Sequence, residues 1–289
     1  MKQMIKNRFS CLAVLIFGIV GLGITACGPT PSDGLDGGDQ RESITHGKAV
    51  KASSDLSKVV VAVVAEKTEG QALCTGSILS ENLILTAAHC VDGNPTQVRI
   101  VFATKVKEAS AEQIRVARGV FQNPFWKNPN TEKQGDLAII QFSGGLPEGF
   151  TSVRLVPKTY KVTTGDSVIF VGYGVTDGLE RTGSGVLRTT KSTVTGQQSP
   201  TEILTDGKET SVCFGDSGGP GFAVIKNNFV QWGVASSVLN QECNEASIHT
   251  SVMAYEPWIR EIIHEFSTPK KSRKPKKSPT TLFLGPSQE

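Results

Sequence analysis

The 289-residue sequence lacks closely spaced cysteine pairs. It contains six cysteines, none within four residues of another: Cys11, Cys27, Cys74, Cys90, Cys213 and Cys243. Zinc-binding cysteines usually lie two to four residues apart, so this spacing disfavours a metal site. The last four cysteines permit three disulfide pairings, among which the sequence alone does not choose. Disulfides would require an oxidising compartment.

Helical periodicity is also scarce. Only Tyr255–Phe266 has a helical pattern, with a proline near its start and apolar residues at every fourth position. The preceding sequence consists of many short β-rich runs broken by Gly, Asn, Asp and Pro, which predicts an all-β fold. Examples are Val59–Ala65, Gln97–Phe102, Leu137–Phe142, Ser167–Val171 and Val230–Val238.

The one long apolar run is at the N-terminus. Basic residues precede the apolar stretch Phe9–Ile24, and residues 1–26 therefore resemble a secretory signal peptide. The run Ile24-Thr25-Ala26-Cys27 resembles the bacterial lipoprotein box, which predicts export and lipid attachment at Cys27, in the periplasm or at the cell surface. The alternatives are an ordinary cleaved signal and an uncleaved membrane anchor.

Both ends of the remaining chain predict disorder. Residues 27–43 are rich in Gly, Pro, Ser and Asp and predict a flexible tether or propeptide. Residues 267–289 form a basic tail that either is simply solvated or contacts anionic lipid or polysaccharide. The net charge of +3 comes from these ends, and the body is mildly acidic. No motif for specific nucleic-acid binding is present in the tail.

Three short runs carry residues for nucleophilic catalysis. Ser217 lies between glycines in Cys213-Phe214-Gly215-Asp216-Ser217-Gly218-Gly219-Pro220, where the backbone can turn sharply and expose a hydroxyl beside an anion-binding concavity. His89 lies in Leu85-Thr86-Ala87-Ala88-His89-Cys90, and Asp136 precedes the apolar run Leu137–Ile140. His, Asp, Ser is one of the chain orders in which a catalytic triad occurs.

With these runs, residues 44–266 resemble the trypsin/chymotrypsin family of serine peptidases. The resemblance implies two six-stranded antiparallel β-barrels that meet near residue 155, an active site between them, and a C-terminal helix. It also implies an endopeptidase that cleaves proteins or peptides through an acyl-enzyme, with His89, Asp136 and Ser217 as catalytic residues and no cofactor. The alternative is a catalytically silent relative that serves as a binding module.

The resemblance assigns supporting roles as well. The amides of Gly215 and Ser217 would form the oxyanion hole, and Ser236 would hydrogen-bond the catalytic aspartate. The implied disulfides are Cys74–Cys90 and Cys213–Cys243. The implied substrate pocket is formed by Ser211, Val212, Val238 and Ser247.

The pocket residues predict a preference for a small or medium uncharged side chain before the cleaved bond. No carboxylate stands at Ser211 to pair with Lys or Arg, and a valine at position 238 would shorten the pocket.

The resemblance also implies a zymogen. Cleavage before Ile44 would free an ammonium group that pairs with Asp216 and orders the oxyanion loop. The same cut would separate the catalytic body from a lipid at Cys27 and release it.

Overall fold

The computed structural model describes residues 44–45, 47–126, 134–267 and 281–282. The predicted signal peptide, the predicted lipidation site at Cys27 and the predicted tether lie outside the described residues, as does most of the basic tail. Within the described part of the chain, no helix is long and apolar enough to cross a membrane.

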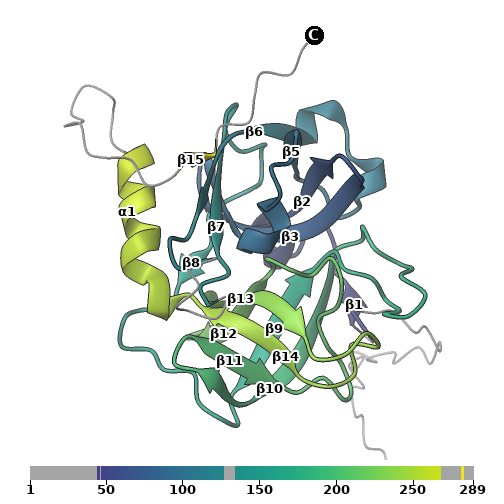
Figure 1. The fold of residues 1–289 in the computed structure, drawn as a ribbon, viewed down its shortest axis with the longest axis vertical. Coiled ribbons are helices and arrows are strands. Elements are labelled where there is room, and N and C mark those ends of the chain that lie inside the picture. Colours follow the sequence, from purple (N-terminus) through teal and green to yellow (C-terminus); the bar gives the residue numbers. More distant parts are fainter. Residues whose placement is uncertain (1–43, 46, 127–133, 268–280, 283–289) are drawn as a thin grey trace, which may run out of the picture. The chain divides into compact units, whose positions relative to one another are not determined.

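The first half of the chain forms a closed six-stranded antiparallel barrel (Figure 1). Its strands pair in the order β2-β3-β4-β7-β6-β5 and back to β2. The strands are β2 (Val60–Lys67), β3 (Gly70–Ser80), β4 (Leu83–Thr86), β5 (Gln97–Val101), β6 (Ile114–Gln122) and β7 (Ala138–Phe142). Their inward apolar side chains form one continuous core, as expected for a small closed barrel.

The second half forms another closed six-stranded antiparallel barrel, paired in the order β9-β10-β11-β14-β13-β12 and back to β9. The strands are β9 (Ser167–Gly172), β10 (Arg188–Ser199), β11 (Glu202–Thr205), β12 (Pro220–Ile225), β13 (Asn228–Val238) and β14 (Ser247–Ser251). Lys226 and Asn227 have φ values of 49° and 61°, the left-handed backbone that a tight hairpin between β12 and β13 requires. The predicted pair of barrels is confirmed.

Shorter elements complete the two barrels. Strand β1 (Lys48–Ala49) pairs with β10, and β8 (Arg154–Leu155) runs parallel to β13. The β8 strand lies where the chain passes from the first barrel to the second. The 3₁₀ helices are η1 (Asp55–Lys58), η2 (Ala88–Val91), η3 (Val106–Glu108), η4 (Ala111–Gln113) and η5 (Met253–Tyr255).

The predicted C-terminal helix is present as α1 (Glu256–Ser267) and packs on the first barrel (Figure 1). Ile259 and Ile262 are fully buried in the core of that barrel. The Phe266 ring lies 5.0 Å from the Phe121 ring of β6, measured between centroids. The helix therefore links the end of the second half of the chain to the first barrel.

The prediction of a wholly disordered tail over residues 267–289 differs from the structure at two places. Ser267 is the last residue of α1, and Thr281–Leu282 form strand β15, which pairs with β6. The physical reason is local composition. Thr281 and Leu282 follow the basic segment 270–277, and threonine is enriched in strands whereas lysine and proline are depleted.

The two disulfides implied by the resemblance are both present. Cys74 bonds to Cys90, which ties β3 to the turn containing His89. Cys213 bonds to Cys243, which ties the segment before Ser217 to the loop between β13 and β14. These bonds join segments on either side of the candidate site and limit their separation.

Candidate active site

The pairing of β4 with β7 brings His89 and Asp136 together. Thr86 at the end of β4 is opposite Ala138 at the start of β7. Because the strands are antiparallel, the residues just after Thr86 and just before Ala138 emerge at the same edge of the barrel. His89 follows in η2 and Asp136 precedes β7, so a contact across 47 positions of sequence results from one strand pairing.

Asp136 holds the His89 ring in one orientation. The carboxylate is 2% exposed, and its Oδ2 atom lies 2.7 Å from His89 Nδ1. Its Oδ1 atom accepts a hydrogen bond of 3.0 Å from the backbone amide of His89. Because a carboxylate only accepts hydrogen bonds, Nδ1 carries the ring hydrogen, and Nε2 of the neutral ring is left as an acceptor.

Ser236 supports the same carboxylate. Its hydroxyl donates a 2.6 Å hydrogen bond to Asp136 Oδ2. Strand β13 has a register shift between Ala235 and Ser237 where it pairs with β14. Such a bulge re-aims a side chain relative to the regular alternation of a strand. The contact expected between Ser236 and Asp136 is therefore present.

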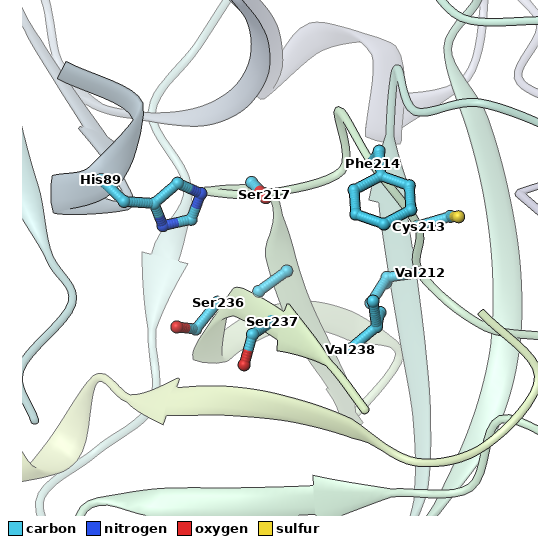
Figure 2. Close-up of a pocket in the computed structure, with 9 residues that line it drawn as sticks. His89, Val212, Cys213, Phe214, Ser217, Ser236, Ser237 and Val238 are labelled. Carbon is cyan, nitrogen blue, oxygen red and sulfur yellow. The ribbon is translucent and has the colours of Figure 1, made fainter. Parts of the chain in front are cut away.

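Ser217 lies beside His89 in a pocket between the barrels. Both residues line this pocket, together with Val212, Cys213, Phe214, Ala235, Ser236, Ser237 and Val238. Figure 2 shows the His89 ring pointing toward Ser217 at one end of the pocket, with Val212 and Val238 at the other end. The geometry brings an acceptor nitrogen and a serine hydroxyl to one opening, as nucleophilic catalysis needs.

A hydrogen bond to the peptide before Gly215 fixes the direction of the Gly215 amide. The carbonyl oxygen of Phe214 accepts a 2.8 Å hydrogen bond from the amide of Val175. The N–H of Gly215 belongs to the same planar peptide and points the opposite way. Gly215 itself has a φ of 99°, a conformation that glycine adopts at little cost.

The amide of Ser217 is directed in the same manner. The carbonyl oxygen of Asp216 accepts a 2.8 Å hydrogen bond from the amide of Gly219, so the N–H of Ser217 points away from that contact. Among the described residues, neither the Ser217 amide nor the Gly215 amide has a protein acceptor. Both are thus free to donate to an oxygen atom of a ligand.

The four residues expected to form the substrate pocket divide into two pairs. Val212 and Val238 line the pocket, whereas Ser211 and Ser247 are each 1% exposed and do not line it. The hydroxyl of Ser211 lies 3.5 Å from that of Ser247. Two branched apolar side chains therefore form one end of the pocket, and the two hydroxyls are buried outside its lining.

Asp216 is fully enclosed next to the nucleophile. Its carboxylate accepts hydrogen bonds from the amides of Gly174 (2.8 Å) and Cys213 (2.9 Å). Burial raises the pKa of Asp216 to about 7, although both amides and the positive charge of Arg188 act in the opposite direction. The two amides are therefore not enough to offset the loss of solvent around this charge.

The segment expected to become a new N-terminus packs against the second half of the chain, beside Ser211. Ile44 is fully buried, and Thr45 forms an antiparallel bridge with Ser211. The Thr45 hydroxyl also accepts a 2.9 Å hydrogen bond from the Ser211 amide. Ile44 therefore enters the protein next to the segment that leads to Asp216.

Sequence reasoning missed other residues at the pocket. Ser237 and Phe214 line it, and the guanidinium carbon of Arg181 lies 3.3 Å from the centroid of the Phe214 ring. Arg181 is separated from Phe214 by two strands of the barrel, β10 and β11, so no local motif relates them. In the sequence, only the position of Phe214 three residues before Ser217 indicates that Phe214 lies near the pocket.

Comparison with known proteins identifies the family of the chain. The family profile described as Trypsin matches residues 45–259. Chymotrypsin-like elastase family member 1 of Macaca fascicularis is 25% identical over 66% of this chain and 78% of its own length. Human granzyme M is 26% identical over 88% of this chain and 97% of its own length. Complement C1s subcomponent of Rattus norvegicus is 29% identical over 68% of this chain, which spans only 33% of that relative. The chain belongs to the trypsin family of serine proteases.

Proposed function

We propose that the protein is an exported serine endopeptidase with His89, Asp136 and Ser217 as its catalytic triad. The observation that carries the proposal is the 2.7 Å contact between Asp136 and His89, in a ring orientation that leaves Nε2 facing the pocket shared with Ser217. Substrates are proteins or peptides, in keeping with the family.

The proposed reaction begins with attack of the Ser217 hydroxyl on the carbonyl carbon of the substrate bond. His89 Nε2 takes the hydroxyl proton and then delivers it to the leaving amine, which leaves an acyl group on Ser217. Water then attacks the acyl-enzyme with the same base assisting. Asp136 stabilises the imidazolium that forms in each step, and Ser236 helps to hold Asp136.

The oxyanion of each tetrahedral intermediate would accept hydrogen bonds from the amides of Gly215 and Ser217. In the part of the chain that the structure describes, both amides lack a protein acceptor, and each is held by the carbonyl contact of its own peptide. Losing one such donor typically lowers kcat by about 10² to 10³-fold.

A small or medium uncharged side chain is the proposed preference before the cleaved bond. Val212 and Val238 narrow the pocket, and no acidic residue is among those that line it. The preference agrees with the elastase name of one relative.

Activation is proposed to follow cleavage before Ile44. The new ammonium group would add a positive charge beside buried Asp216, whose pKa is raised in the uncut chain even with the charge of Arg188 acting on it. If Cys27 carries lipid, this cut also releases the catalytic body, and the anchored form is latent. The basic tail would then be the remaining means of holding the enzyme at an anionic surface.

A fluorophosphonate probe tests the function directly. Chain that begins at Ile44 is expected to react with the probe at Ser217, and Ser217→Ala is expected to remain unlabelled. A folded, unlabelled wild-type chain would instead support the catalytically silent binding module. Sequencing the N-terminus of the active form, and assaying it beside lipid-bearing chain that begins at Cys27, tests latency. Equal activity of the two forms would refute latency.

A further inference from the structure

Thr75 contacts the active-site turn from the opposite barrel. This residue is fully buried in β3, next to the disulfide-bonded Cys74. Its hydroxyl donates a 2.8 Å hydrogen bond to the carbonyl oxygen of Gly215 and accepts a 3.1 Å hydrogen bond from the amide of Tyr173. One hydroxyl of the first barrel thus bridges two segments of the second.

The backbone of Thr75 makes a second contact with the same turn. Its amide donates a 2.8 Å hydrogen bond to the carbonyl oxygen of Ser217. The turn also approaches Thr75 so closely that a β-carbon on Gly218 would collide with the Thr75 carbonyl oxygen. Thr75 therefore hydrogen-bonds the carbonyl groups of both residues whose amides are the proposed oxyanion donors.

We propose that Thr75 is a positioning residue for the oxyanion hole, an inference that rests on the proposed function. The hydroxyl fixes the peptide that follows Gly215, a residue whose missing side chain leaves its backbone unusually free to rotate. The Gly215 N–H belongs to the preceding peptide, which shares the Gly215 Cα, so a rotation of the following peptide that displaces this Cα also displaces the N–H. Oxyanion donors act only within a narrow range of distance, so a small rotation weakens catalysis.

A valine side chain cannot replace the Thr75 hydroxyl, because valine has no hydrogen-bond donor in its side chain. In Thr75→Val the Gly215 carbonyl and the Tyr173 amide each lose the buried partner that the structure provides. The Gly215 carbonyl then gains by turning toward any other donor, including water in the pocket. Thr75→Ser keeps the hydroxyl and removes only a methyl group.

The test compares the two variants with wild type in chain that begins at Ile44. The substrate is a peptidyl p-nitroanilide with valine before the cleaved bond, and active-site titration gives kcat per competent site. Thr75→Val is expected to lower kcat about 10- to 100-fold with KM within about twofold, since a misdirected donor is a partial loss of an oxyanion contact. A peptide aldehyde, which binds as a tetrahedral oxyanion, is expected to lose affinity by a similar factor. Thr75→Ser is expected to retain most of the activity.

Ser57→Ala is the matched control for loss of a buried hydroxyl. Ser57 is 6% exposed in η1 of the first barrel, and its hydroxyl donates to the carbonyl oxygens of Ala52 and Ser54, which are not part of the site. It is expected to lower the melting temperature without changing kcat. Equal kcat in Thr75→Val and wild type, or an equal loss in Thr75→Ser, would overturn the proposal.

A folding defect is separated from a positioning defect by a further variant. If Thr75→Val does not fold, Thr75→Ala is used in the same assays, because this variant also removes the hydroxyl and adds no second methyl group. Failure of both variants to give native near-ultraviolet circular dichroism would assign the hydroxyl to stability and overturn the proposal. Lack of activity in the wild type would contradict the proposed function itself, whereas an active wild type with unaffected variants would contradict only the role of Thr75.

Discussion

Replacing Val238 with glycine tests which side chain sets the depth of the substrate pocket. Val238 lies at the end of β13, lines the pocket opposite the catalytic end, and pairs with Ser247 of β14 (Figure 2). Removing its side chain is expected to open a path to the buried hydroxyls of Ser211 and Ser247. The pocket then becomes deeper and more polar at its base.

The expected gain for a large side chain follows from the carbon atoms removed. Three carbons at about 0.8 kcal/mol each correspond to about 2.4 kcal/mol of additional burial, or about 50-fold in kcat/KM. The assay measures kcat/KM for peptidyl p-nitroanilides that differ only in the residue before the cleaved bond. Wild type is expected to favour Ala or Val over Phe, and Val238→Gly to raise the ratio of Phe to Val about 50-fold.

Val224→Gly is the control for the cost of glycine in a strand. Val224 is 54% exposed in β12 of the same barrel, and it does not line the pocket. Its replacement is expected to lower stability by about 1 kcal/mol and to leave the ratio of Phe to Val unchanged. An active Val238→Gly enzyme with the wild-type ratio, or a wild type that cleaves fastest after Lys or Arg, would refute the reasoning.

Four further predictions concern the proposed catalytic groups and the neighbouring Asp216. Ser217→Ala is expected to abolish peptide hydrolysis without changing the melting temperature, and more than a few per cent of residual activity would contradict this prediction. Asp136→Asn is expected to lower kcat about 10⁴-fold, because the His89 ring then takes the wrong tautomer. Ser236→Ala removes a 2.6 Å hydrogen bond to the buried carboxylate of Asp136. Urea titration is therefore expected to show a loss of about 1.5 to 3 kcal/mol in the free energy of unfolding, and kcat is expected to fall. For uncut chain, the raised pKa of Asp216 predicts that stability falls as pH rises from about 4 to about 7, because ionisation is resisted only in the folded state. Melting temperatures measured across this pH range check the trend. Asp216→Asn is expected to weaken the dependence on pH, and a wild-type melting temperature that does not change with pH would contradict the prediction.

The strands and the helix could be predicted because their patterns are local. The run Val59–Ala65 is nearly the observed β2, and the fourfold spacing of apolar residues correctly marks α1. The meeting of His89 with Asp136 depends instead on the register of β4 and β7, which no local pattern specifies. It could be anticipated only through the resemblance to a family in which that register is already known.

Thr75 illustrates what the sequence does not reveal. A threonine in a strand is ordinary, because β-branched residues favour strands. Its hydroxyl becomes informative only through a contact with Gly215 across 140 positions of sequence. The pocket has the same difficulty, since the resemblance implied four pocket residues. It could not distinguish Val212 and Val238, which line the pocket, from Ser211 and Ser247, which are buried outside the lining.

Two sets of contacts hold the turn that carries Ser217, and cleavage of the chain is expected to affect them differently. The contacts of Thr75 with Gly215 and Ser217 come from β3 and need no new N-terminus. The enclosure of Asp216, by contrast, disfavours the ionised form of its carboxylate, as the raised pKa indicates. Under the proposed activation, the new ammonium group would stabilise that ionised form. The latency proposed for the uncut chain would then depend on the balance between these two sets of contacts, and Thr75 would keep part of the proposed oxyanion hole in place before activation.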